Sequence, residues 1–105
     1  MFATLRRYEG IDAGHKDELT KKVGEKLAPR LSKLPGFSGY FLVDTGEDVM
    51  SSISLFDTSA QANESTRVAS EWVRDEKLDG ILKTPPKVTD GEVIVHKTGN
   101  GTIRA

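Results

Sequence analysis

Residues 34–56 read LPGFSGYFLVDTGEDVMSSISLF and contain the end of a helix followed by two strands. A helix should end at Leu34–Gly36, because the residue before a proline avoids helical angles and glycine supplies a turn. Phe37–Asp44 and Val49–Phe56 have the composition of strands, and Thr45–Asp48 between them is typical of a short turn. The stretch therefore predicts a helix that leads directly into an antiparallel β-hairpin.

A strand and a helix precede this hairpin. Alternating residues predict a strand over Phe2–Glu9, which Gly10 ends, and Asp12 is the expected cap of the following helix. Pro29 removes one backbone donor inside this helix, predicted over residues 14–33, so we expect a kink or two nearly collinear pieces. Its apolar stripe recurs at steps of four and three and consists of Leu19, Val23, Leu27, Leu31 and Leu34.

A second helix and a last strand follow the hairpin. Thr58 and Gln61 have the spacing of a capping box, with Asp57 as the alternative cap, and the helix should run to about Lys77. The last strand is predicted over Val88–Lys97. The buried stripe of the helix comprises Val68, Ala69, Trp72 and Val73.

The order of these elements is strand, helix, strand, strand, helix, strand. This order predicts an α+β fold of the ferredoxin-like kind, in which two helices cover one face of a four-stranded antiparallel sheet. The 105 residues fit one domain, over residues 1–97, and the glycines and asparagine near the end predict a flexible tail over residues 98–105. The other face of the sheet is then left open.

Alternation along the strands separates their residues into two sets, one for each face of the sheet. The first set is almost wholly apolar and is expected beneath the helices: Ala3, Leu5, Phe37, Phe41, Val43, Val49, Ile53, Leu55, Val93 and Val95. The second set mixes rings, hydroxyls and charge: Thr4, Arg6, Tyr8, Ser38, Tyr40, Leu42, Met50, Ser52, Ser54, Phe56, Ile94 and His96. A face in bulk water would carry more Lys and Glu, so we expect another subunit to cover the second set.

Composition excludes several classes of function. The 15 basic and 16 acidic residues nearly cancel and are interspersed, so there is no electrostatic footprint for nucleic acid or an anionic membrane. No stretch is long and apolar enough for a membrane span, and with no cysteine the chain fits a reducing compartment, so a cytoplasmic location is expected. Two distant histidines, and no glycine-rich phosphate loop, argue against a metal or a nucleotide, and no cofactor is expected.

Three segments in this topology carry a resemblance to a known family. They are LPGFSGY at Leu34–Tyr40, SLF at Ser54–Phe56 and ASEWV at Ala69–Val73. With them the chain resembles the dimeric α/β-barrel superfamily, and within it small bacterial proteins related to the antibiotic-biosynthesis monooxygenases. The resemblance implies a homodimer whose sheets pack face to face, with a pocket between sheet and helices in each subunit. Both the barrel interior and this pocket are then candidate sites.

Members of this superfamily include cofactor-free oxygenases, haem-degrading enzymes, isomerases and proteins with no assigned activity. Haem-degrading relatives rely on an Asn on the first strand, a Trp near the third strand and a His on the second helix. Here the first strand offers Thr4 and Arg6, the third Ser52 and Ser54, and the second helix has no His, which disfavours haem degradation. Cofactor-free relatives hold a phenol with a Tyr, a Trp, an Asn and sometimes an Arg, roles that cannot be matched to Tyr40 or Trp72 residue by residue.

The candidate ligand-binding residues are Arg6, Tyr8, Tyr40, Trp72 and His96, and the candidate catalytic residues are Tyr40 and His96. Arg6, Tyr8, Tyr40 and His96 are predicted on the sheet face away from the helices, where they could converge on an anion or a phenol. Packing between two subunits explains the same set. Trp72 could fill the core or line a pocket wall.

Three functional hypotheses remain open at the level of sequence. The first is a cofactor-independent monooxygenase acting on a small aromatic compound, which requires no metal and no bound cofactor. The second is a non-catalytic binder or sensor that uses the same cavity. The third is a purely structural dimer whose barrel is filled by side chains.

Overall fold

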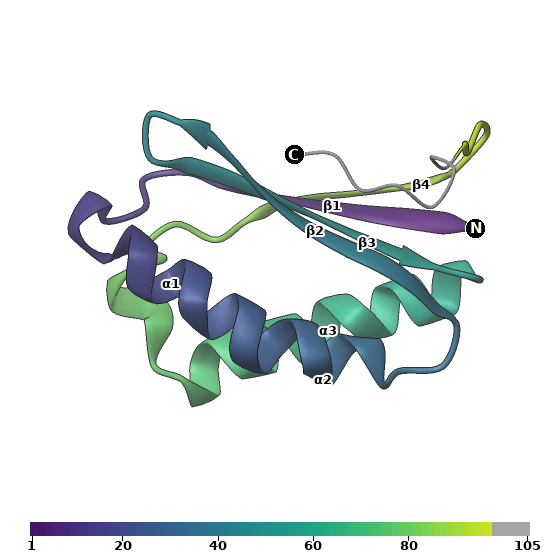
Figure 1. Ribbon diagram of the computed structural model, residues 1–105, viewed down its shortest axis with the longest axis horizontal. Coiled ribbons are helices and arrows are strands. Elements are labelled where there is room, and N and C mark those ends of the chain that lie inside the picture. The colour runs from purple at the N-terminus through teal and green to yellow at the C-terminus, as the bar shows by residue number, and fades with distance from the viewer. Residues whose placement is uncertain (98–105) are drawn as a thin grey trace.

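The ferredoxin-like fold is confirmed in the computed structural model, which describes residues 1–97 (Figure 1). The predicted tail over residues 98–105 lies outside the described residues. In chain order the elements are β1 (Phe2–Tyr8), a 3₁₀ turn (Ala13–His15), α1 (Lys16–Lys22), a π-helical turn (Val23–Leu27), α2 (Ala28–Ser32), β2 (Phe37–Gly46), β3 (Val49–Phe56), α3 (Ser59–Asp75), a second 3₁₀ turn (Leu78–Gly80) and β4 (Lys87–Glu92).

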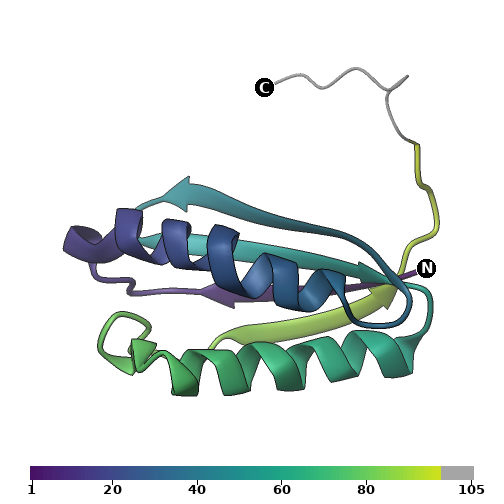
Figure 2. The same ribbon diagram turned by 60° about the horizontal axis from the view of Figure 1, so that its bottom comes forward.

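The strands form one antiparallel sheet in the order β2-β3-β1-β4. The run from α1 to α2 and helix α3 lie side by side on one face of this sheet, which leaves the opposite face uncovered (Figures 1 and 2). None of the helices within residues 1–97 has the length and apolar character that a membrane crossing needs.

The first helix accommodates Pro29 without a break. Pro29 lies in the first turn of α2, directly after the π-helical turn, and the N–H of Ala28 donates to the carbonyl of Val23, five residues back. Backbone angles stay helical from Val23 to Leu27, so α1 and α2 are two pieces of one continuous helix, as expected. A wider turn next to a proline is one of the recognised ways in which a helix absorbs a missing donor.

The turn before α3 confirms the predicted capping box. The N–H of Gln61 donates to Thr58 Oγ1 over 3.2 Å, and Gln61 Oε1 accepts from the N–H of Thr58 over 3.1 Å. Gly36 lies against this cap with a φ of +77°, and a Cβ on it would come within 1.9 Å of Gln61 Oε1. Only glycine combines this left-handed angle with so close an approach.

The last strand is shorter than predicted. β4 ends at Glu92, opposite Phe2, and the N–H of Val93 makes one more bond, to the carbonyl of Met1. The expected strand over Val88–Lys97 is therefore wrong beyond this point. β4 is an edge strand that pairs with β1, and within the described residues their pairing ends where Glu92 lies opposite Phe2.

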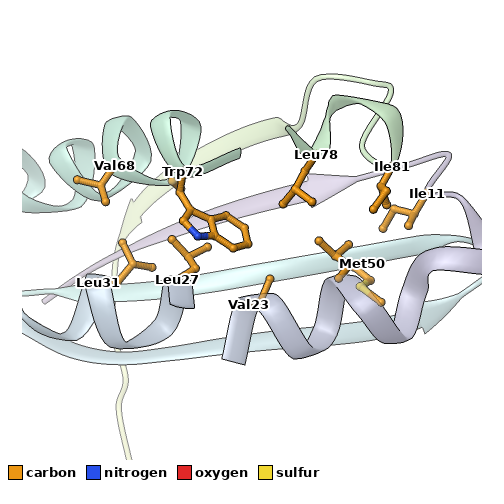
Figure 3. Packing of buried hydrophobic residues seen from close by; sticks show 11 residues of the cluster. Ile11, Val23, Leu27, Leu31, Met50, Val68, Trp72, Leu78 and Ile81 are labelled. Carbon is orange, nitrogen blue, oxygen red and sulfur yellow. The ribbon is translucent and has the colours of Figure 1, made fainter. Parts of the chain in front are cut away.

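The two faces of the sheet are opposite to the prediction. The mixed set faces the helices: Thr4, Arg6, Met50, Ser52, Ser54 and Phe56 are buried, and Tyr8, Tyr40 and Leu42 pack against the core. In the apolar set Leu5, Phe41 and Val43 are 43, 55 and 43% exposed. Alternation distinguishes two faces but does not say which one meets the helices. The helices themselves supply most of the apolar core, including Leu19, Val23, Leu27, Leu31, Val68 and Trp72 (Figure 3).

Phe37 is an exception within the apolar set. A bulge between Phe37 and Gly39 shifts the register of β2, so Phe37 turns to the helix side. There its ring meets that of Phe56 edge-on, with centroids 5.7 Å apart. Such a T-shaped pair is a favourable arrangement of two aromatic quadrupoles.

Candidate functional site

A cavity lies between the sheet and the helices. Three of its lining residues are aromatic with a polar atom: Tyr8 at the end of β1, Tyr40 on β2 and Trp72 on α3. The rest of the wall is apolar and comes from α1, the π-helical turn, β2, β3, α3 and the segment after the second 3₁₀ turn. The space open to the centre of a water molecule is about 20 Å³, which is room for roughly one water.

Trp72 reaches the cavity because it belongs to the buried stripe of α3. Its side chain points from α3 towards Leu27 of the π-helical turn (Figure 3). Trp72 is only 3% exposed, and its indole Nε1 has no hydrogen-bond partner among the described residues. A buried N–H without an acceptor is costly, so a ligand that accepts from Nε1 gains affinity here. Trp72 thus both packs in the core and lines the cavity wall.

Both tyrosines around the cavity are held in their neutral form. Burial, with a smaller repulsion from Tyr8, raises the pKa of Tyr40 to about 12, while Arg6 and a hydrogen bond from Ser52 act in the opposite direction. Burial also raises the pKa of Tyr8, against the attraction of Arg6. At neutral pH the two phenols are therefore hydrogen-bond donors and not bases.

Arg6 forms a polar cluster beside the cavity. Its side chain is 2% exposed, and Nη1 donates to Ser54 over 3.2 Å and to Ser52 over 3.4 Å, both on β3. Nη2 donates to two residues of α3, Ser65 over 2.9 Å and Thr66 over 3.2 Å. The Nε atom has no partner among the described residues. Burial lowers the pKa of the Arg6 guanidinium, against the attraction of Tyr8, Tyr40 and Asp90.

The partner of Arg6 is therefore a group of four neutral hydroxyls. Within residues 1–97 no carboxylate forms an ion pair with it. Hydroxyls satisfy the donors of a guanidinium but leave its charge uncompensated, which makes its burial costly. The positive charge of Arg6 also acts on the nearby cavity, because its attraction lowers the pKa of both Tyr8 and Tyr40 against the larger effect of burial.

The structure brings together Arg6, Tyr8, Tyr40 and Trp72, but on the helix side of the sheet and not on the open side as predicted. His96 is exposed and follows the end of β4, so the predicted place of its side chain on the sheet is wrong. It does not line the cavity. His15 is exposed, with Nδ1 3.3 Å from a carboxylate oxygen of Asp12.

Sequence reasoning missed the hydroxyl partners of Arg6. Alternation placed Ser52 and Ser54 on the same face as Arg6, yet no role was expected for them. Ser65 is fully buried and lies three and four residues before Val68 and Ala69 on the stripe of α3. A small polar residue on the buried stripe of a helix, in a chain with an arginine on a strand that the helix covers, indicates such a cluster.

The wall of the cavity is mostly apolar and suits a flat ligand with a hydrogen-bond acceptor, but the space must widen before such a ligand can enter. The cavity lining has donors at Tyr8, Tyr40 and Trp72 but no carboxylate and no imidazole. Within residues 1–97 there is also no group of three or more His, Cys, Asp or Glu side chains that could bind a metal ion. Ligand binding at this site therefore relies on apolar contact and on donated hydrogen bonds.

Comparison with known proteins identifies the fold. No protein-family model matches the chain, and no curated protein matches it. Among solved structures, a protein of unknown function from Nitrosomonas europaea is 19% identical, with a TM-score of 0.74 over 95% of each chain. A protein named antibiotic biosynthesis monooxygenase is 12% identical, with a TM-score of 0.68 over 90% of this chain and 100% of that one.

A third solved structure is a monooxygenase of Streptomyces coelicolor in complex with the ligand nanaomycin D. It is 16% identical, with a TM-score of 0.65 over 99% of this chain and 91% of that one. At these identities the likeness shows the fold. The ferredoxin-like architecture implied by the resemblance to antibiotic-biosynthesis monooxygenases is thus confirmed, and the reaction is a separate question.

Proposed function

We propose that this protein is a cofactor-independent monooxygenase that binds a small aromatic compound in the cavity between the sheet and the helices. The observation that carries the proposal is the convergence of Tyr8, Tyr40 and Trp72 on an otherwise apolar cavity. In a widened cavity an aromatic ring would lie against Trp72, and an oxygen on the ring would accept from the tyrosine hydroxyls and from the indole N–H. The similar monooxygenase with nanaomycin D bound supports an aromatic ligand for this fold.

The reaction that suits this site needs no electrons from the protein. A phenol with a free ring position reacts with O₂ to give a quinone and water, so one oxygen atom enters the ring and the other leaves as water. All the electrons come from the substrate. Tyr8 and Tyr40 stay protonated and stabilise the oxygen on which negative charge develops, which is the role of donors in an oxyanion site.

The open face of the sheet supports a homodimer. Leu5, Phe41 and Val43 are exposed apolar side chains on this face, and cross-strand pairing places Ile53 between Leu5 and Phe41. Large exposed apolar patches mark contact surfaces in soluble proteins. We therefore propose that the open faces of two copies pack together, and that the dimer is cytoplasmic, as the absence of cysteine suggests.

One observation favours a non-catalytic binder as the second candidate. The cavity lining has no side chain that takes up a proton at neutral pH, because its titratable groups are two tyrosines with raised pKa values. A sensor needs no such base, whereas an oxygenase without one requires a substrate that loses its proton easily.

Oxygen consumption with 1-naphthol tests the proposal. We expect uptake of O₂, formation of 1,4-naphthoquinone and, with ¹⁸O₂, one labelled oxygen in the quinone. Tyr40→Phe should lower the rate about tenfold or more, because it removes a donor from the site. His96→Ala should leave the rate unchanged, since His96 is exposed and does not line the cavity.

Binding is followed separately through tryptophan fluorescence. Trp72 is the single tryptophan of the chain, so quenching by 1-naphthol reports on the cavity wall. Quenching without oxygen uptake would reject the oxygenase and support the non-catalytic binder. No quenching and no uptake would reject both.

A further inference from the structure

A groove on the surface adjoins the cavity. This outer groove has a volume of about 290 Å³ and is lined by the C-terminal half of α3, the segment Leu82–Pro86 and the end of β1. Tyr8, Val73 and Leu82 line both the outer groove and the cavity. These three side chains therefore form the wall that separates the cavity from the surface.

The outer groove continues into a second open hollow along α3. Ser70 and Val73 line both depressions, and Arg74 and Lys77 complete the second one. Lys83 lines the outer groove itself. Three basic side chains thus lie outside the wall, and among the side chains that the structure describes no acidic one lines either depression.

These three cations have no ion-pair partner within the described part of the chain. The basic residues in contact with carboxylates there are others, such as Lys26 and Arg67. Lys83 makes a minor contribution to the lowered pKa of Asp12, after the N–H of Gly14 and His15. In a chain whose charges otherwise nearly balance, three uncompensated cations beside one groove attract an anion.

The cavity itself is too small for an aromatic ring as it stands. An apolar cavity that accepts benzene has a volume of roughly 150 Å³, against about 20 Å³ here. A ring can enter from the larger outer groove when Tyr8, Val73 and Leu82 move aside, because these three side chains line both spaces. A ligand in the opened site therefore extends from Trp72 to the basic surface.

We propose that the ligand is an aromatic compound with a carboxylate or similar anionic oxygen group on a short side chain. Its ring occupies the cavity against Trp72, and its anionic group lies beside Lys83 of the outer groove, where the groove meets the second hollow with Arg74. This inference rests on the proposed function, since it assumes that the cavity is the ligand site. It adds the charge of the substrate and the direction from which the substrate enters.

A matched pair of probes isolates the charge. (1-Naphthyloxy)acetate and its methyl ester share the same ring and side chain, and quenching of Trp72 gives the affinity of each. We expect the acid to bind about tenfold more tightly than the ester at low salt, because the cations beside the groove attract the carboxylate and the ester has no charge. The preference should shrink as salt is added, since the groove is open to solvent.

Substitutions show which side chains cause the preference for the acid. Lys83→Met combined with Arg74→Met should abolish the preference for the acid, while Lys21→Met, an exposed lysine of α1 outside both depressions, should retain it. Equal binding of acid and ester to the unaltered protein would overturn this inference and leave the cavity as a ligand site. A preference that survives Lys83→Met/Arg74→Met would also overturn it. If neither probe quenches Trp72, the proposed function fails, and this inference fails with it.

Discussion

Arg6 on β1 and Ser65 on α3 are joined by a hydrogen bond of 2.9 Å in the interior of the protein. The bond connects the sheet to the helix that covers it, and Ser65 in turn donates to the carbonyl of Ala62 over 2.6 Å. The guanidinium of Arg6 is thus held by the hydrogen bonds that it donates to side chains of β3 and α3. Nothing within residues 1–97 neutralises its charge by direct pairing.

Arg6→Met should leave the free energy of unfolding unchanged or raise it by about 1 kcal/mol. Methionine keeps an unbranched apolar stem, although a shorter one, and removes a buried charge that only hydroxyls contact. Ser65→Ala should instead lower it by about 1–3 kcal/mol, because it deprives the buried guanidinium of an acceptor. Urea denaturation measures both changes.

Arg7→Met is the matched control for Arg6→Met. Arg7 neighbours Arg6 in β1 but is exposed and pairs with Glu9, so its effect should stay within about 0.5 kcal/mol. A loss of several kcal/mol in Arg6→Met alone would show that the hydroxyl cluster outweighs the cost of burying the charge.

Stability should fall at alkaline pH because of Tyr40. Its pKa in the folded protein is about 12, above the ordinary value of 10.0, so the unfolded chain ionises first. The contribution is therefore fully present below pH 10 and is lost as the pH rises towards 12. Urea midpoints measured between pH 8 and about pH 11 should decrease, and Tyr40→Phe should flatten this decrease.

Tyr8 should also lower the stability at alkaline pH, because burial raises its pKa as well. A residual alkaline slope in Tyr40→Phe should disappear in Tyr8→Phe/Tyr40→Phe, which removes both tyrosines of the chain. An unchanged slope in that double variant would mean that other groups cause the loss.

Phe41→Lys should convert the proposed dimer into monomers. Phe41 is 55% exposed on the open face, on edge strand β2 beside Ile53, and a lysine there would place a charge in the desolvated contact that we propose. Val88→Lys is the control, because Val88 is 44% exposed but pairs with Arg6 and so belongs to the other face. Sedimentation equilibrium at micromolar concentration should show dissociation for the first variant only. A monomeric unaltered protein would refute the dimer.

Gly36→Ala should destabilise the fold by about 2 kcal/mol. Alanine pays roughly 1–2 kcal/mol for the left-handed φ of +77°, and its Cβ would displace the side chain of Gln61 from the capping box. A double-mutant cycle separates the two causes. In a Gln61→Ala background the clash is absent, so the cost of Gly36→Ala should fall to that of the backbone angle. An undiminished cost would show that Gln61 moves away freely.

Local features of the chain were predictable in detail. Leu34–Gly36 ends α2, and Thr58 with Gln61 begins α3, because these signals depend on backbone angles and on hydrogen bonds within a few residues. The grouping of Arg6, Tyr8 and Tyr40 on one face was also correct, since alternation in a strand is a local property. What was wrong was the direction in which that face points.

The sequence by itself determined the elements, their order and the two sets of strand residues, because turns, caps and periodicity act over a few residues. Only the tertiary structure decided that the set with Arg6 and Tyr40 meets the helices, and that Leu5 and Phe41 are left outside. A period of two is unchanged when the sheet is turned over, so it cannot choose between its faces. The same holds for β4, whose end at Glu92 depends on where β1 begins. The helices, with their own apolar stripe, pack on the face that contains serines and an arginine, and that contact creates the cavity beneath Trp72.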